Sequence, residues 1–274
     1  MKYSVFSALM LLLFVSVLLS CDTTTDNDEV LIIQDELPQM EILANYLTTR
    51  GNLDVTVVDQ ETLPGSLVQY ESVIMYIHGE LHEPTEMAVI EYTENGGRLI
   101  SLHHSISSGK AKNQFYFDFL GIQLDNPGQS SQPVEPGGGY GWTHNAADGS
   151  PVTLTLVNLN PGHYIVANDI SWGDSISYTP SDFPSTEESY ATIDLPESEI
   201  YFNHKFTDGR AKTVIMGYKY FDDRNDQLFM QDRAGWTKPS GDGDIVYLMP
   251  GHSSQEFENP QYSQMILNSV QWRR

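Results

Sequence analysis

From residue 29 to residue 104, short apolar runs alternate with segments of helical periodicity. Four apolar runs of five or six residues are predicted to be strands: 29–34, 53–58, 72–77 and 98–102. Two segments with apolar side chains three and four residues apart are predicted to be helices: 40–50 and 84–95. Continuously apolar strands that alternate with helices indicate a parallel sheet covered on both faces. This half of the chain therefore predicts a doubly wound, mostly parallel α/β fold.

The second half of the chain departs from this alternation. Residues 125–150 are rich in Gly, Pro, Ser and Gln, and predict a long surface loop or insertion. Strand-like runs and a closing helix follow, at 152–157, 213–220, 245–248 and 259–272. We therefore expect a single domain over residues 29–272 with a loop-rich insertion at about 122–212.

The N-terminal residues have the pattern of an export signal. A helix that spans a bilayer needs about 20 apolar residues. The apolar run at 5–19 is shorter than that, but its length suits a signal-peptide core. It ends in Leu18-Leu19-Ser20-Cys21, which resembles a bacterial lipobox. The resemblance implies a cleaved lipoprotein signal peptide (1–20), a lipidated Cys21, an acidic tether (21–28) and a protein anchored in the bacterial cell envelope. The alternative is an uncleaved N-terminal helix with an incidental cysteine.

Charge and cysteine content exclude several classes of function. Lys and Arg number 14, Asp and Glu number 37, and the formal net charge is −23. Such an acidic surface repels phosphate, so we expect no nucleic-acid partner and membrane contact only through the lipid anchor. The single cysteine excludes intrachain disulfides, CxxC zinc sites and iron–sulfur clusters.

Histidines follow three of the predicted strands. His78 comes after the strand at 72–77, His103 and His104 after 98–102, and His252 after 245–248. Because ligands gather at the carboxyl ends of strands in doubly wound sheets, we expect these side chains to line one crevice. His103 and His252 should lie within roughly 10 Å, about one ligand diameter, of each other. The alternative is that each histidine only hydrogen-bonds the backbone at its own strand end.

Two of these strand ends belong to longer segments that resemble the ThuA-like (trehalose utilisation) family. They are Asn95-Gly-Gly-Arg-Leu-Ile-Ser-Leu-His103 and Gly243-Asp-Ile-Val-Tyr-Leu-Met-Pro-Gly-His252, supported by Phe257–Tyr262 and Asn268–Trp272. The resemblance implies a flavodoxin-type fold like that of class I glutamine amidotransferases. It also implies sugar catabolism, with 3-keto-glycosides as the more specific substrate class. Where the family usually has His-Pro-Ile and Asp-Glu-(Ile/Leu)-Tyr, this chain has imperfect counterparts at His163 and Glu199.

Histidine and carboxylate side chains allow two kinds of chemistry at the predicted crevice. His103 and His252 could act as general acid and base, or together with His78 and Glu80 could hold a divalent metal such as zinc. No HExxH or similar ligand spacing is present. Side chains expected to contact substrate are His78, Glu80, His104, Trp142, His163 and Glu199, with the Trp142 indole stacking on a sugar ring.

Other familiar chemistries do not fit the sequence. A cysteine-dependent amidotransferase is excluded because the turn after 98–102 carries His103 and His104 instead of a cysteine. Ser105 lacks a G-x-S-x-G context, and the acidic segments 221–226 and 241–244 do not complete a calcium loop. We therefore expect a lipid-anchored protein that acts on a carbohydrate. The alternative is a carbohydrate-binding lipoprotein without catalytic activity.

Overall fold

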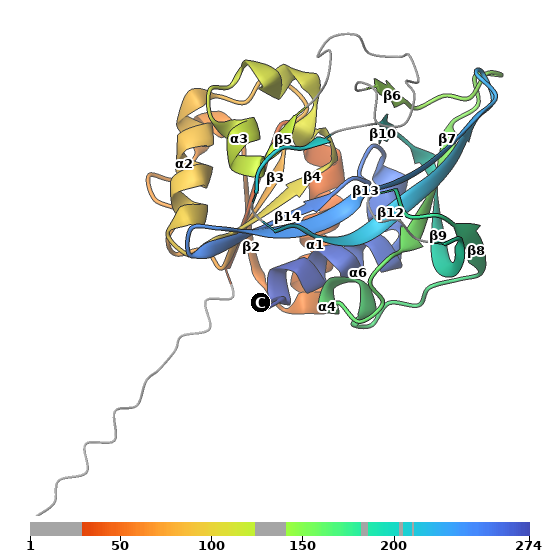
Figure 1. Cartoon of the computed structure of the whole chain (residues 1–274). Helices are drawn as coiled ribbons and strands as arrows, with labels where there is room; N and C mark the ends of the chain where they lie inside the picture. The colour runs from red at the N-terminus through yellow and green to blue at the C-terminus, as the bar shows by residue number, and fades with distance from the viewer. Residues whose placement is uncertain (1–28, 124–140, 182–185, 203–204, 210) are drawn as a thin grey trace, which may run out of the picture.

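A ten-stranded mixed sheet forms the centre of the protein (Figure 1). The computed structural model describes residues 29–123, 141–181, 186–202, 205–209 and 211–274. The predicted signal peptide, the tether with Cys21 and most of the glycine-rich segment at 125–150 lie outside the described residues. The strands lie in the order β2-β1-β3-β4-β14-β13-β12-β7-β9-β8.

The first five strands in this order are parallel and form the centre of the fold. They are β2 (Asp54–Val58), β1 (Glu29–Gln34), β3 (Ser72–Tyr76), β4 (Arg98–Leu102) and β14 (Gly243–Leu248). Every residue of β3, β4 and β14 is buried, as expected for strands that are covered on both faces. The predicted strands of the first half are confirmed, and their carboxyl ends lie along one edge of the sheet.

The other five strands are antiparallel and extend the sheet beyond β14. They are β13 (Gln227–Ser240), β12 (Thr213–Asp222), β7 (Val152–Asn158), β9 (Glu188–Ser198) and β8 (Ser175–Tyr178). Two short pairs lie outside the main sheet: β6 (Gly141–Thr143) with β10 (Ile200–Phe202), and β5 (Ile122–Gln123) with β11 (Lys205–Phe206). The described part of the expected insertion is thus rich in strands instead of loops, and the parallel part of the sheet is narrower than expected.

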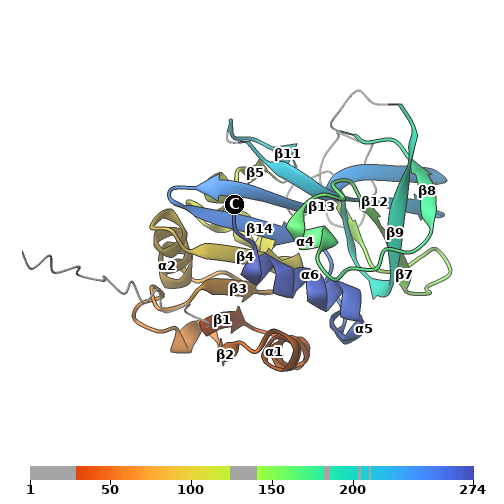
Figure 2. The same ribbon diagram turned by 90° about the horizontal axis from the view of Figure 1, so that it is seen from below.

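Helices cover both faces of the parallel strands. The helices are α1 (Leu37–Gly51), α2 (Glu83–Glu94), α3 (Tyr116–Leu120), α4 (Tyr164–Ala167), α5 (Ser254–Glu258) and α6 (Pro260–Gln271). Figure 1 shows α2 and α3 above β14 and α6 below it, and Figure 2 shows α6 in front of the sheet. The helix α1 packs against α5 and α6. No helix among the described residues is long and apolar enough to cross a bilayer.

Candidate functional site

Three segments distant in the sequence bring their side chains to the carboxyl edge of the parallel strands. His103 directly follows β4 in a short 3₁₀ turn, η2 (His103–Ile106), and has a left-handed φ of 43°. His252 follows β14 after a turn at Gly251, where an added Cβ would lie only 3.1 Å from Cβ of His103. Glu199 lies between β9 and β10, where the chain leaves the main sheet to pair with β6. The glycine therefore lets the two histidine turns approach closely.

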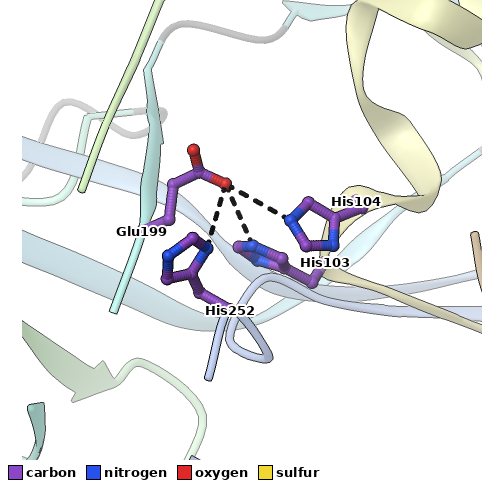
Figure 3. A group of neighbouring side chains, drawn as sticks. All are labelled: His103, His104, Glu199 and His252. Atoms are coloured by element: carbon purple, nitrogen blue, oxygen red, sulfur yellow. Dashed lines mark ion pairs between the residues drawn. The ribbon is translucent and has the colours of Figure 1, made fainter. Parts of the chain in front are cut away.

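Three imidazole nitrogens converge on one oxygen of Glu199 (Figure 3). Oε2 lies 3.1 Å from Nε2 of His103, 3.7 Å from Nε2 of His104 and 3.7 Å from Nδ1 of His252. One such atom from each of the four side chains lies within 4.8 Å of all the others. Ligands at about 2.0–2.1 Å from a tetrahedral zinc ion are about 3.3–3.4 Å apart, so these nitrogen–oxygen distances suit four donors around one cation.

The hydrogen bond at the far side of His103 fixes which nitrogen faces Glu199. Nδ1 lies 2.6 Å from the carbonyl oxygen of Met249, and a carbonyl can only accept, so Nδ1 carries the hydrogen. In a neutral imidazole, Nε2 then presents a lone pair to a carboxylate oxygen 3.1 Å away. Nε2 of His103 is buried and has no hydrogen-bond partner. The Nε2 lone pair and the carboxylate oxygen repel each other at this distance. A proton or a metal ion between the two atoms would remove this repulsion, and we take the need for such a cation as the chemical signature of the site.

The electrostatics of the four side chains suit a cation. Burial would raise the pKa of the Glu199 carboxyl, but the His103 and His252 imidazoles outweigh it and hold this pKa well below its ordinary value. Burial, together with the neighbouring His103 and His78, lowers the pKa of His104 far below its ordinary value. The Glu199 carboxylate raises the pKa of His252. The cluster therefore holds one carboxylate anion beside buried imidazoles, and neutral imidazole is the form that binds metal.

This donor set fits a divalent transition ion. Imidazole nitrogen suits zinc, copper, iron and nickel, and a carboxylate oxygen completes a site of mixed nitrogen and oxygen donors. Two of the nitrogens that face Glu199, Nε2 of His103 and Nδ1 of His252, are buried without a hydrogen-bond partner. His103, His104, His252 and Glu199 are thus the residues that could hold a metal.

A second group surrounds the other nitrogen of His104. Its Nδ1 lies 3.8 Å from Oε2 of Glu36, and Oε1 of Glu36 lies 2.9 Å from Nδ1 of His78. The rings of His78 and His104 are stacked, with centroids 4.2 Å apart. Glu36 precedes α1, but its side chain does not cap that helix. Its carboxylate hydrogen-bonds His78 and lies near His104 without a hydrogen bond to it.

A cavity of about 510 Å³ opens beside the cluster. Glu199, His104 and His252 line its floor, and Trp142, His144 and Tyr201 line one wall. The rings of Trp142, His144 and His252 form a continuous stack, with centroid distances of 5.2 Å and 5.5 Å. At the rim, the exposed side chains of Lys112 and Glu80 form an ion pair at 2.8 Å. An aromatic wall beside a polar floor suits a polyhydroxylated ligand with apolar ring faces.

Buried side chains hold the loop that carries His252. The hydroxyls of Tyr76 and Tyr262 donate to the carbonyls of Gly251 and Pro250, at 2.6 Å and 2.5 Å. Oε2 of Glu256 accepts hydrogen bonds from the backbone N–H groups of residues 251, 252 and 253, and its Oε1 accepts one from the hydroxyl of Ser198. Glu256 therefore joins the His252 loop to the residue next to Glu199.

The structure brings together most of the residues that the sequence singles out. The ring centroids of His103 and His252 are 5.7 Å apart, inside the expected distance of roughly 10 Å. The side chains of His78, Trp142 and Glu80 line the same cavity, but Glu80 lies at the rim, apart from the group that could hold a metal. His78 likewise is not one of the four converging ligands, so the expected metal set of His78, His103 and His252 needs correction.

Two expected roles do not fit the positions of their residues. His163 caps α4, accepting from the N–H of Ile165, and packs against Trp272, away from the cavity. It is therefore not placed to bind substrate. His103 is completely buried, and its ring nitrogens face Met249 and Glu199. It is placed as a ligand and not as a proton donor or acceptor that touches substrate.

The sequence reasoning missed Glu36 and Tyr201. Glu36 lies two residues beyond the end of β1, at the same edge of the sheet as the histidines. Attention to every acidic residue just past a strand end could have found it. The ring centroids of Tyr201 and His103 are 5.1 Å apart. Tyr201 reaches this position because β10 pairs with β6. No local sequence pattern predicts that pairing.

Comparison with known proteins confirms the fold. The chain is similar to a ThuA-like protein from Bacteroides uniformis, with 17% identity over 89% of each chain and a TM-score of 0.58. It also matches a β-galactosidase from Rahnella sp. R3 at 13% identity over 87% of this chain and 30% of that one, with a TM-score of 0.48. A glutamine amidotransferase from Thermotoga maritima matches at 11% identity over 89% of this chain and 96% of that one, with a TM-score of 0.44.

At 17% identity, the structural similarity to the Bacteroides uniformis protein shows the α/β fold with its parallel core, and not an activity. No curated protein matches the sequence. The model of the ThuA family, described as trehalose utilisation, matches residues 29–273, which is nearly the whole of the described region. The chain therefore belongs to the ThuA family.

Proposed function

We propose that this protein is a metal-dependent enzyme that cleaves glycosides, with 3-keto-glycosides as its substrate class. The observation that carries the proposal is the convergence of three imidazole nitrogens on Oε2 of Glu199, 3.1 Å from Nε2 of His103. Such an arrangement is repulsive without a cation, and it adjoins a cavity large enough for a sugar. Membership of a family described as trehalose utilisation supports a carbohydrate substrate.

His103, His104, His252 and Glu199 would hold the metal. A divalent ion held by these four residues would supply Lewis-acid polarisation of a substrate carbonyl if it takes the carbonyl oxygen as a further ligand. The protein's own residues orient the substrate and exclude water. The wall made by Trp142 and His144 orients the sugar ring, and the buried ligands keep water away from the inner side of the site.

A ketone at C3 makes glycoside cleavage accessible to such a site. The hydrogen on C2 lies next to the carbonyl, so a general base can remove it as a proton. The electrons of the C2–H bond form a C1–C2 double bond, the C1–O bond breaks, and the departing alcohol oxygen takes up the proton. Addition of water across the double bond then completes hydrolysis. Neither stage needs an oxidant or a reductant.

The proposed place of this activity is the bacterial cell envelope. The lipobox-like Leu18-Leu19-Ser20-Cys21 and the acidic residues that follow support an anchored protein with a short tether. The attachment and the location rest on the sequence pattern alone.

The test is turnover by the purified protein. Methyl 3-keto-β-glucoside and methyl β-glucoside are incubated with wild type and with His103→Ala, and release of methanol is measured. We expect cleavage of the keto sugar by wild type and a loss of at least about 100-fold in His103→Ala, as for a metal ligand. Saturable sugar binding without turnover, unaffected by His103→Ala, would instead establish a carbohydrate-binding protein.

A further inference from the structure

We propose that His78, oriented by Glu36, is the proton acceptor that faces the substrate. This inference rests on the proposed function, since it names the base of that reaction. The cavity is lined by four histidines, and those that bind the metal cannot also accept a proton from substrate. His78 is not one of the four side chains that converge in the cluster. Among the four histidines that line the cavity it has the most exposed side chain, at 59%.

Glu36 determines the tautomer of His78. Nδ1 of His78 lies 2.9 Å from Oε1 of Glu36, and a carboxylate can only accept a hydrogen bond. Nδ1 therefore carries the hydrogen in the neutral ring, and Nε2 holds the free lone pair. The same relation of carboxylate, Nδ1–H and basic Nε2 prepares histidine bases in other enzymes.

The remaining cavity histidine is less suited to this role. His144 is stacked between Trp142 and His252, so both faces of its ring are covered. Its Nδ1 lies 3.8 Å from Oε1 of Glu199, which directs that edge of the ring toward the metal cluster. The ring of His78 stacks on His104, and its side chain is 59% exposed.

The backbone of His78 is held more rigidly than the exposure of its side chain suggests. Asp35 accepts hydrogen bonds from the N–H groups of His78 and Gly79, at 2.7 Å and 2.6 Å. On the other side of the same segment, the buried Nζ of Lys110 donates to the carbonyls of Ile77 and His78, at 2.6 Å and 2.9 Å. A base held in this way needs little rearrangement when substrate binds.

The proton balance of the elimination is then complete. The C2 proton of the 3-keto-glycoside moves to Nε2 of His78, and the C2–H electrons form the C1–C2 double bond as the C1–O bond breaks. The imidazolium gives the same proton to the departing alcohol oxygen. His78 returns to its neutral form, and Glu36 holds Nδ1–H throughout.

A spectroscopic experiment tests the tautomer without any activity. The full mature protein, labelled with ¹⁵N-histidine and loaded with Zn²⁺, is compared with His78→Gln to assign the ring, and with Glu36→Gln. Two-bond ¹H–¹⁵N correlations should show His78 with hydrogen on Nδ1 in wild type and with a changed tautomer population in Glu36→Gln. A wild-type His78 with hydrogen on Nε2, or with the shifts of a metal-bound nitrogen, overturns the proposal.

Kinetics and metal content complete the test. His78→Gln should lower kcat for methyl 3-keto-β-glucoside about 10²–10⁴-fold, abolish exchange of the C2 hydrogen in D₂O, and keep the wild-type zinc content. His82→Gln is the matched control, because His82 is also exposed but pairs with Glu61 outside the cavity lining. An active wild type whose His78→Gln variant retains its rate overturns the assignment of His78 alone. A wild type without metal and without turnover would contradict the proposed function itself.

Discussion

At the scale of single residues, the site depends on which atoms already have partners. The Met249 carbonyl accepts a hydrogen bond from Nδ1 of His103, and Glu36 accepts one from Nδ1 of His78. Nε2 of His103 therefore faces a buried carboxylate, whereas Nε2 of His78 is left without that neighbour, on a side chain that lines the cavity. Two side chains that look equivalent in the sequence, each just past a strand end, acquire different chemistry in this way.

Trp142 should contribute to sugar binding more than to the chemical step. Its indole lines the cavity and is stacked on His144, so its removal takes away an apolar ring contact. We expect Trp142→Ala to raise KM for the keto sugar about tenfold, corresponding to roughly 1.4 kcal/mol of aromatic contact, with kcat nearly unchanged. Trp142→Phe should restore most of the binding. A large fall in kcat with constant KM would show a different role for the indole.

In the metal-free protein, the interaction between His252 and Glu199 should depend on pH in a defined direction. The Glu199 carboxylate raises the pKa of His252 in the folded state. Stabilisation from this pair is then complete below the unfolded value of about 6.5 and is lost as pH rises through the folded pKa. Urea unfolding in EDTA should therefore show a larger difference between wild type and His252→Gln at about pH 5.5 than at about pH 8.5. A difference that grows with pH would contradict this interpretation.

At the scale of elements, the short helix α5 connects the two halves of the site. Glu256 accepts three backbone hydrogen bonds around His252 and one from the hydroxyl of Ser198, next to Glu199. Glu256→Gln replaces one acceptor oxygen by a donor, so the three backbone N–H groups and the Ser198 hydroxyl cannot all keep their acceptors. We expect a loss of about 1–3 kcal/mol in the free energy of unfolding and weaker zinc binding. Glu258→Gln, in the same helix but exposed, should change neither quantity measurably.

The elements also show what the sequence could predict. The parallel strands can be predicted because they are short apolar runs. The shared location of the histidines after β3, β4 and β14 can be predicted from their positions at strand ends. Glu199 reaches the site by another route, because β9 is irregular near Glu197, with a φ of 53°, and pairs with β7 as far as Ser198, and the chain then continues as β10 beside β6. That change of partner depends on contacts between distant segments. The same lack of a local signal explains the misplaced expectation for His163.

At the scale of the whole molecule, the predicted attachment to a membrane can be tested independently of the site. The lipobox-like sequence makes Cys21 the only acyl-bearing thiol of the chain. Two acyl chains on this residue give stable anchoring, whereas one binds only marginally. Cys21→Ala should therefore move the protein from the membrane fraction to the soluble fraction, while Ser20→Ala, which keeps a small residue before the cysteine, should leave it anchored. A Cys21→Ala protein that still sediments with membranes after a high-salt wash would contradict the lipoprotein interpretation.

The central claim is that the His103, His104, His252 and Glu199 cluster holds a metal ion, and metal analysis tests it most directly. Protein purified without chelators or nickel resin is measured by mass spectrometry of its metals, beside Glu199→Gln and the rim variant Glu80→Gln. We predict one divalent transition ion per chain in wild type and in Glu80→Gln, and an affinity at least about 100-fold lower in Glu199→Gln. A wild type that holds no such ion after dialysis against zinc, or equal metal content in all three proteins, would contradict the account.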